Sequence, residues 1–356
     1  MSEKNETAFL ISSLLITVVL VGVGFWWLSK RFVIVPKYSV PSNTSTITTP
    51  SNTGNPPTTT QPDGDDFVKV QGVPVGLFSY GGSTTWAPIR LLVDSAIQAA
   101  RPEFKLRYVD PIDIPPGSGA GIKMLLDGQL SFAQSSRPIQ ESEFQQAQQR
   151  GFNLQQIPVA IEGVAIAINP NLNIAGLTLS QLKAIYTGQI DNWNQVGGPD
   201  IRIIPYSRKI ESGGTVDFFV KQILGGKDFG ANVQFVANTT EGLQRVADSP
   251  GGIYYASAPE VVPQCSIKPV AIGRDDREFV PPYKPPFVPP QLCPAQRNQL
   301  NLEAFRQGKY PITRYLFVIV KQNGQIDQQA GEAYANLLLT PQGQAAIEKA
   351  GFVRIR

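Results

Sequence analysis

The sequence predicts an α/β protein with about two domains, and three observations indicate this class. The chain has 356 residues, and a single domain typically takes roughly 150. Short apolar runs typical of buried strands, such as Val164–Ile168 and Leu316–Val320, alternate with helical patterns such as residues 89–100. Hydrophobic residues make up 42% of the chain and charged residues 17%, which is the balance of a globular protein.

An uncharged apolar segment, Phe9–Leu28, precedes the part of the chain expected to fold. About 20 helical residues, at a rise of about 1.5 Å each, span the hydrocarbon core of a bilayer. Trp26 and Trp27 stand at the end of the segment, where interfacial aromatic residues are common. We therefore expect residues 1–30 to form an uncleaved transmembrane signal anchor, with a cleaved signal peptide as the alternative.

The next segment, residues 31–67, is predicted to be a linker. Ser39–Pro62 is uncharged and consists almost wholly of Ser, Thr, Asn, Pro and Gly, so it cannot bury enough apolar surface to fold. A stalk of this kind suits a domain held outside the cytoplasm. The flanking charges favour the opposite orientation, because Lys4 precedes the apolar segment and three basic residues between positions 30 and 37 follow it.

In the body of the chain, loops of small and hydroxylated residues precede three helices. Glycine bares backbone N–H groups, a hydroxyl stands beside them, and the helix dipole adds positive potential, a combination that favours an anion. A plain helix cap is the alternative for any one loop. The loops are Tyr80–Pro88 with Ser83 and Thr84, Pro116–Gly121 with Ser118 and Gly119, and Glu211–Thr215 with Ser212, Gly213, Gly214 and Thr215.

Two arginines follow strand-like segments close to these loops. They are Arg137, in the segment Gln134–Pro138, and Arg208, in the segment Tyr206–Lys209. A guanidinium group offers a planar set of donors that suits a tetrahedral oxyanion. We therefore expect both arginines to face the same ligand as the loops, with surface solvation as the alternative.

The composition excludes several kinds of chemistry. The chain has no histidine, which removes histidine-based acid–base catalysis, Ser-His-Asp systems and imidazole metal sites. Two cysteines are too few for a zinc or iron–sulfur site. The formal net charge of +3 gives no basis for nucleic-acid binding. We expect no enzyme activity, no cofactor and no metal.

A series of motifs resembles the phosphate-binding protein of the ABC phosphate importer. In chain order they are GGSTTWAP, GSGAG, FAQSSRP, EGVAIAINP, LTLSQLKAIYTGQIDNW, SRKIESGGTVDFF, SPGGIYYAS and KYPITRYLFVIV. The resemblance covers about 280 residues, from roughly 74 to 356. It implies a type II periplasmic-binding-protein fold, in which two α/β domains joined by two crossing strands grip phosphate between them. Domain I is then 68–161 with 312–356, and domain II is 162–311.

The resemblance also implies a set of ligand-binding residues. Thr84 and Ser118 would donate hydrogen bonds, Ser212–Thr215 would form a nest of N–H groups, and Arg208, or else Lys209, would supply the counter-charge. Altogether the candidates are Ser83, Thr84, Ser118, Gly119, Ser136, Arg137, Arg208, Ser212, Gly213, Gly214 and Thr215.

Position 136 departs from the family pattern. Ser136 stands where the family has an aspartate that accepts a proton from the ligand, and Arg137 follows it. A dianion should therefore be held at least as well as a monoanion, and affinity should hold or rise between about pH 6 and 8.5, where the dianion becomes dominant.

Cys265 and Cys293 flank a proline-rich segment, Phe279–Pro290, that favours an extended surface loop. Two cysteines around such a loop in an exported domain predict a disulfide. Two unrelated thiols in a cytosolic protein are the alternative.

The function expected from the resemblance is capture of inorganic phosphate outside the cytoplasm and its delivery to an ABC permease. The protein would act as a monomer on the periplasmic or extracellular face, anchored to the inner membrane by its N-terminal helix. A phosphate sensor or surface-interaction protein with the same fold is the alternative.

Overall fold

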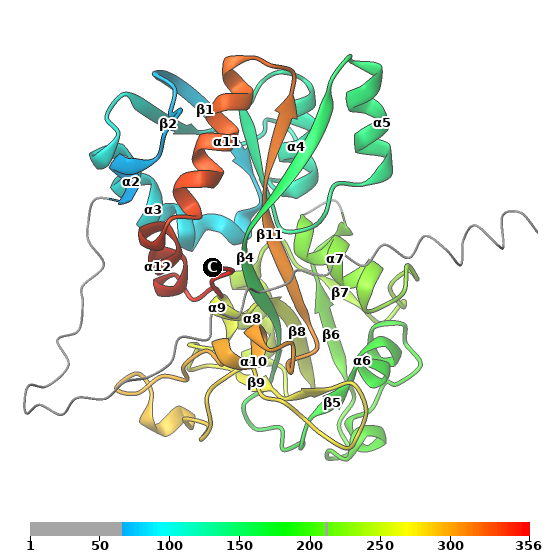
Figure 1. The fold of residues 1–356 in the computed structure, drawn as a ribbon. Helices are drawn as coiled ribbons and strands as arrows, with labels where there is room; N and C mark the ends of the chain where they lie inside the picture. Colours follow the sequence, from blue (N-terminus) through cyan, green and yellow to red (C-terminus); the bar gives the residue numbers. More distant parts are fainter. Residues whose placement is uncertain (1–65, 211–212) are drawn as a thin grey trace, which may run out of the picture. The chain divides into compact units, whose positions relative to one another are not determined.

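The computed structural model describes residues 66–210 and 213–356, which form two α/β lobes (Figure 1). The predicted anchor, residues 1–30, and nearly all of the predicted linker lie outside the described residues. Within the described ranges, no helix is both long enough and apolar enough to cross a bilayer. The α/β class expected from the alternating pattern is confirmed.

The first lobe is built on a sheet in which β1 pairs in parallel with β2 and β3, so the carboxyl ends of β1 and β3 lie side by side. Phe67 is fully buried, so the packed body begins ahead of Val68. The elements are α2 (Asp66–Lys69), β1 (Gly76–Gly82), η1 (Thr84–Trp86), α3 (Ala87–Ala100), β2 (Phe104–Tyr108), α4 (Ser118–Leu126), β3 (Phe132–Ser135), α5 (Glu141–Gln149), α11 (Ile326–Leu338) and α12 (Pro341–Lys349).

The second lobe contains a smaller set of strands around its own hydrophobic core, which includes Trp193, Phe219 and Tyr255. Strand β8 pairs in parallel with β6, which pairs with β7. The elements are β5 (Leu177–Thr178), α6 (Leu179–Tyr186), η2 (Trp193–Val196), β6 (Ile204–Ser207), α7 (Gly214–Gln222), β7 (Gln234–Phe235), α8 (Thr239–Asp248), β8 (Gly252–Ser257), α9 (Ala258–Val261), β9 (Lys268–Val270), β10 (Ile272–Gly273), η4 (Pro290–Leu292) and α10 (Leu302–Arg306).

Two long antiparallel strands, β4 (Asn153–Ile168) and β11 (Thr313–Gln322), run through both lobes (Figure 1). Strand β4 pairs with β11 over 153–163 and then with β8 over 164–168. The strand order is therefore continuous, β2-β1-β3-β11-β4-β8-β6-β7. The change of partner after residue 163 marks where the chain passes from one lobe to the other.

Side chains of β11 divide between the two faces of the first-lobe sheet. Leu316 and Val318 join the core cluster under α3, α11 and α12, whereas Phe317 and Ile319 join the cluster under α4 and α5. Successive strand residues point to opposite faces. An unbroken apolar run is therefore what a strand covered on both faces requires.

A β-bulge interrupts the pairing of β4 with β11. Leu316 pairs with Ala160 but Phe317 pairs with Pro158, so Val159 is an extra residue on β4. Proline has no N–H group to donate to the ladder, so within a central strand it is tolerated at a bulge of this kind. Gln344 of α12 donates from Nε2 to the carbonyl oxygen of Val159 at 2.9 Å, which satisfies this bulged backbone group.

The predicted disulfide between Cys265 and Cys293 is confirmed, with the two Cα atoms 5.7 Å apart. The proline-rich segment that it encloses is partly packed on the second lobe. Val280 and Tyr283 contact the lobe's core, and Tyr283 lies against Phe287 with ring centroids 5.4 Å apart.

Replacing both cysteines by serine is expected to lower the free energy of unfolding by about 3–4 kcal/mol in the chain-entropy account, because the bridge closes a loop with a sequence separation of 28. Chemical unfolding of the two proteins measures the difference. Thiol labelling of the denatured, unreduced protein should find no free thiol at 265 or 293, and stoichiometric labelling of both would contradict the assignment.

Candidate functional site

Three buried serines meet at the carboxyl edge of the first-lobe sheet. Ser83 follows β1, Ser118 begins α4 and Ser136 follows β3. Ser83 Oγ donates to Ser136 Oγ at 2.9 Å, and the Ser136 backbone N–H donates to Ser118 Oγ at 3.0 Å. Because β1 and β3 are parallel neighbours, the loops after them lie side by side at the same edge of the sheet. The crevice at this edge is where α/β proteins bind ligands.

Helix α7 of the second lobe begins directly against this serine cluster. A methyl group on Gly214 would overlap the Oγ atoms of both Ser118 and Ser136. The preceding residue, Gly213, has φ +134°, a conformation that L side chains rarely adopt. Glycine at both positions therefore allows the α7 N-terminus, with its partial positive charge, to approach the hydroxyl groups.

The other expected site residues differ in how far they are buried. Thr84 is exposed, whereas its neighbour Thr85 is buried. Lys209 is exposed and Arg208 is half-buried. Ser212 lies outside the described residues. Gly119 lies beside Arg137, since a Cβ on Gly119 would stand 3.3 Å from an Arg137 guanidinium nitrogen.

Arg137 carries ion pairs within and between the lobes. Its NH2 nitrogen lies 2.7 Å from Glu143 Oε1 of α5, and its Nε lies 2.8 Å from Asp217 Oδ2 of α7. Gln140 also donates to Asp217, at 3.0 Å. A cavity of about 420 Å³ opens beside this group and is lined in part by Gly119 and Gly213. Arg137 therefore connects the two lobes through Asp217, an acid that was not predicted from the sequence to belong to the site.

A buried ion pair on the two crossing strands completes the junction. Arg314 of β11 and Glu162 of β4 are direct cross-strand partners and form a salt bridge, with side chains 2% and 0% exposed. Glu162 Oε2 also accepts a hydrogen bond from Ser257 Oγ at 2.6 Å. Sequence reasoning missed this pair. Its signal in the sequence is a charged residue shortly before each apolar strand run, Glu162 before Val164–Ile168 and Arg314 before Leu316–Val320.

Glu260, in α9, is a second acid near these charges. Burial, together with the negative charge of Glu162, raises the pKa of Glu260 to about 7, although the positive charges of Arg208 and Arg314 act to lower it. The Glu260 carboxyl therefore changes charge near neutral pH.

Glu260→Gln is expected to change how stability depends on pH. In the unfolded wild-type chain Glu260 titrates near 4.5, while in the folded chain it titrates near 7. Between these values the folded state holds the proton more tightly, so the free energy of unfolding falls as pH rises, by up to roughly 3 kcal/mol. Glutamine stays neutral and removes this fall. Urea unfolding of both proteins at pH 5 and pH 8 measures the change in the free energy of unfolding. An equal decrease in the wild type and in Glu260→Gln would contradict the raised pKa of Glu260.

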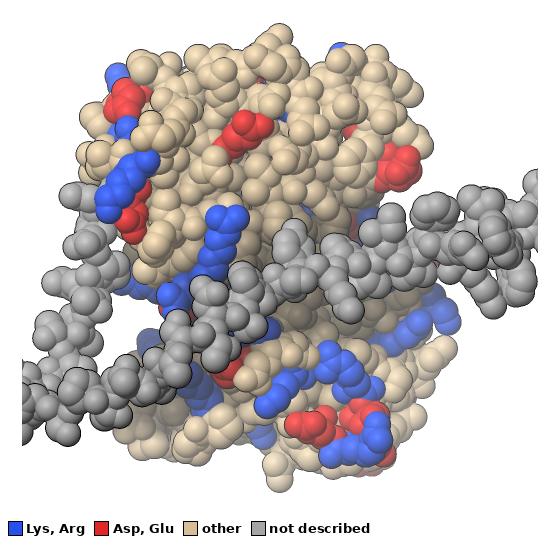
Figure 2. All heavy atoms as spheres, viewed as in Figure 1, with Lys and Arg blue, Asp and Glu red and all other residues tan. Residues whose placement is uncertain are grey.

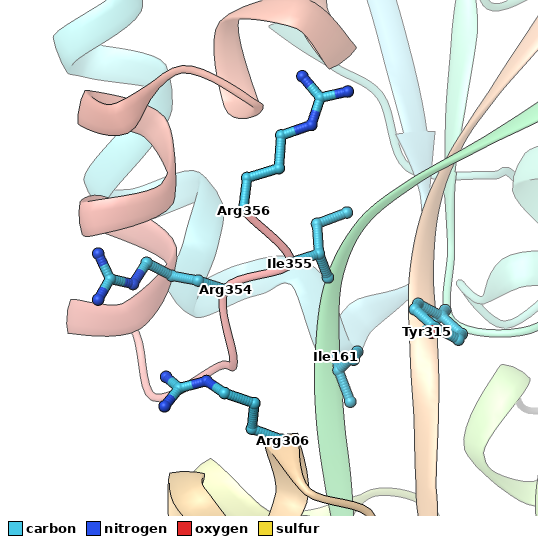
Figure 3. Close-up of a pocket in the computed structure, with 6 residues that line it drawn as sticks. All are labelled: Ile161, Arg306, Tyr315, Arg354, Ile355 and Arg356. Atoms are coloured by element: carbon cyan, nitrogen blue, oxygen red, sulfur yellow. The ribbon is translucent and has the colours of Figure 1, made fainter. Parts of the chain in front are cut away.

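A separate hollow of about 550 Å³ lies beside the crossing strands, lined by Ile161, Tyr315 and three arginines (Figure 3). Arg306 and Arg354 extend to one side, whereas Arg356 points away from them. Both Arg306 and Arg354 pair with Glu348. The three guanidinium groups therefore do not converge on one point.

On the face seen in Figure 2, Lys and Arg lie beside Asp and Glu at several places, and further Lys and Arg side chains lie along the upper part of the lower lobe. Among residues 66–210 and 213–356, no group of three or more Cys, Asp or Glu side chains is arranged to hold a metal ion.

Residues 50–342 match the family model described as a PBP superfamily domain, and the chain belongs to this family. Its mixed α/β fold matches that of type II periplasmic binding proteins. The chain is 29% identical over 241 residues to the phosphate-binding protein PstS of Staphylococcus epidermidis RP62A, covering 67% of each protein. It is 28% identical over 241 residues to PstS of Staphylococcus aureus USA300, again over 67% of each.

Two solved structures show the same fold. One is a putative phosphate ABC transporter substrate-binding protein with bound phosphate from Clostridium perfringens, with TM-score 0.63 and 24% identity, matched over 79% of this chain and 100% of that one. The other is an ABC-type phosphate transport receptor from Vibrio cholerae, with TM-score 0.59 and 22% identity over 78% and 99%.

Proposed function

We propose that this protein captures inorganic phosphate between its two lobes and delivers it to an ABC permease. The observation that carries the proposal is the buried cluster of Ser83, Ser118 and Ser136 facing the α7 N-terminus at Gly214. Hydroxyl and N–H donors held by the fold can surround an oxyanion at little ordering cost. The phosphate-binding relatives support this ligand.

Arg208 is proposed as the counter-charge, with Lys209 as the alternative, and Ser212–Thr215 as the nest on the second lobe. We further propose domain limits of 68–161 with 312–356, and 162–311, so that the lobes close about β4 and β11. The protein would act as a monomer outside the cytoplasm, held at the membrane by residues 1–30.

Calorimetry of the full chain against phosphate, sulfate, arsenate and molybdate tests the ligand. One phosphate per chain is expected, with affinity that holds or rises from pH 6 to 8.5.

Ser118→Ala should cost about 1–3 kcal/mol of binding free energy through an unmade hydrogen bond, whereas Ser142→Ala, at an exposed position, should cost almost nothing. Arg208→Ala should weaken binding far more than Arg202→Ala, whose side chain is exposed. Absence of phosphate binding would return the loops to plain helix caps.

Protease shaving of intact spheroplasts tests the location. Digestion of the body from outside is expected, and a protected body would overturn the importer model.

The Arg137–Asp217 ion pair should slow release of phosphate from the closed cleft. Asp217→Asn removes the negative charge that joins α7 to Arg137 of the first lobe, and Arg137 keeps its other partner, Glu143. The closed cleft then loses one attraction between the lobes. The dissociation rate of phosphate should therefore rise roughly 3- to 10-fold, as expected for the loss of a partly buried ion pair. Stopped-flow release measures it. Lys221→Met is the control, because Lys221 pairs with Asp217 from an exposed position on the same helix. Equal rates in both variants would contradict this role.

A further inference from the structure

A single guanidinium group joins both lobes at the candidate site. Besides its pair with Glu162, Arg314 donates from NH1 to the Gly214 carbonyl oxygen at 2.9 Å. Its NH2 group donates to Thr215 Oγ1 at 2.8 Å and to Thr85 Oγ1 at 3.2 Å. Thr85 belongs to the first lobe and Thr215 to the second, so one side chain from a crossing strand contacts both.

The direction of these hydrogen bonds determines what the threonines can do. A guanidinium group has donors only, so each threonine hydroxyl must act as the acceptor toward Arg314. The O–H hydrogen of each threonine is then directed to another partner. Within residues 66–210 and 213–356, the side-chain hydrogen bonds of Thr85 and Thr215 are those in which their hydroxyl oxygens accept from Arg314.

Both threonines lie next to the serine cluster. Thr85 is two residues after Ser83, and Thr215 follows Gly214, which contacts Ser118 and Ser136. The acid that neutralises Arg314 is itself fixed, since Glu162 accepts from Ser257 on its other oxygen. Arg314 is held further by the Phe218 ring, whose centroid is 5.3 Å from its guanidinium carbon. The guanidinium group is therefore held in place before any ligand arrives.

We propose that Arg314, held by Glu162, is a positioning residue that turns the Thr85 and Thr215 hydroxyl groups into a pair of hydrogen-bond donors toward the bound anion, one from each lobe. This rests on the proposed function. It adds Thr85 to the ligand set and gives closure a chemical consequence, because both hydroxyls point their hydrogens into the cleft only when the lobes meet at Arg314.

Calorimetry with inorganic phosphate on the full chain tests the proposal through matched pairs. Thr85→Val and Thr215→Val remove the hydroxyl, whereas Thr85→Ser and Thr215→Ser keep it. Each valine variant should raise Kd roughly 10- to 100-fold, as expected for a lost hydrogen bond to a charged group. Each serine variant should stay within about threefold of wild type. Valine variants that bind as tightly as their serine counterparts would overturn the proposal.

A double-mutant cycle separates positioning from simple contact. Arg314→Lys keeps the charge but loses the planar set of donors. In that background Thr85→Val should cost much less than in the wild type, because the hydroxyl is no longer oriented. Equal costs in the two backgrounds would overturn the positioning role. Should Arg314→Lys fail to fold by circular dichroism, the cycle is run with Ser257→Ala instead, which loosens the acid that holds Arg314. Wild-type protein that binds no phosphate would overturn the proposed function itself, an outcome distinct from phosphate binding that the threonine variants leave unchanged.

Discussion

Gly214→Ala is expected to raise the Kd for phosphate roughly 10- to 100-fold. The added methyl group would overlap Ser118 and Ser136 across the cleft, and overpacking of this kind costs about 1–3 kcal/mol. The clash exists only when the lobes meet, so the variant relieves it by opening. The melting temperature without phosphate should therefore change little, while calorimetry reports the loss of affinity.

Gly242→Ala is the matched control. Gly242 also lies in a helix and is also tightly packed, but a Cβ there would meet the Tyr254 ring at 2.8 Å within the second lobe. Opening the cleft does not relieve this contact. The control should lower the melting temperature and leave affinity nearly unchanged. A Gly214→Ala variant with wild-type affinity would show that the lobes do not close on this helix.

Glu162→Gln should lower the free energy of unfolding by about 3–5 kcal/mol, because it leaves the buried charge of Arg314 without its partner. The double variant Glu162→Gln/Arg314→Met removes both charges and should recover most of the loss. Chemical unfolding measures all three proteins.

Glu303→Gln provides the comparison for a surface pair. Glu303 and Arg306 are 57% and 42% exposed, so solvent screens their attraction and the substitution should cost less than about 1 kcal/mol. Equal losses for Glu162→Gln and Glu303→Gln would mean that Arg314 does not depend on Glu162.

The parts of the site that lie close together in the chain could be predicted. Loops rich in glycine and hydroxyl groups before helices indicated Ser83, Ser118 and Gly214, because the physics of an N-terminal anion site is local. Which of Thr84 and Thr85 is buried could not be determined from sequence. Neighbouring residues in a short 3₁₀ turn face different directions, and the pattern does not give the phase of that turn.

The charged pairs could not be predicted for a different reason. Arg314 and Glu162 are 152 residues apart, and strand register alone makes them neighbours. Arg137 and Asp217 come from different lobes, so their contact requires the arrangement of both. Each acid appears in the sequence as one surface charge among many until its partner is known.

The bulge at Val159 has a mechanical consequence. Two hydrogen-bonded strands resist bending along their length, but an extra residue lets one strand twist against the other without breaking the ladder on either side. We therefore expect the β4–β11 ribbon to twist most readily at Pro158–Val159, a short way along β4 from the lobe boundary. Because Gln344 holds the Val159 carbonyl and also the backbone N–H of Ile355, twisting there pulls on the C-terminal helix and tail. A change of twist between the lobes would therefore move the C-terminal tail at Ile355 as well as the crossing strands.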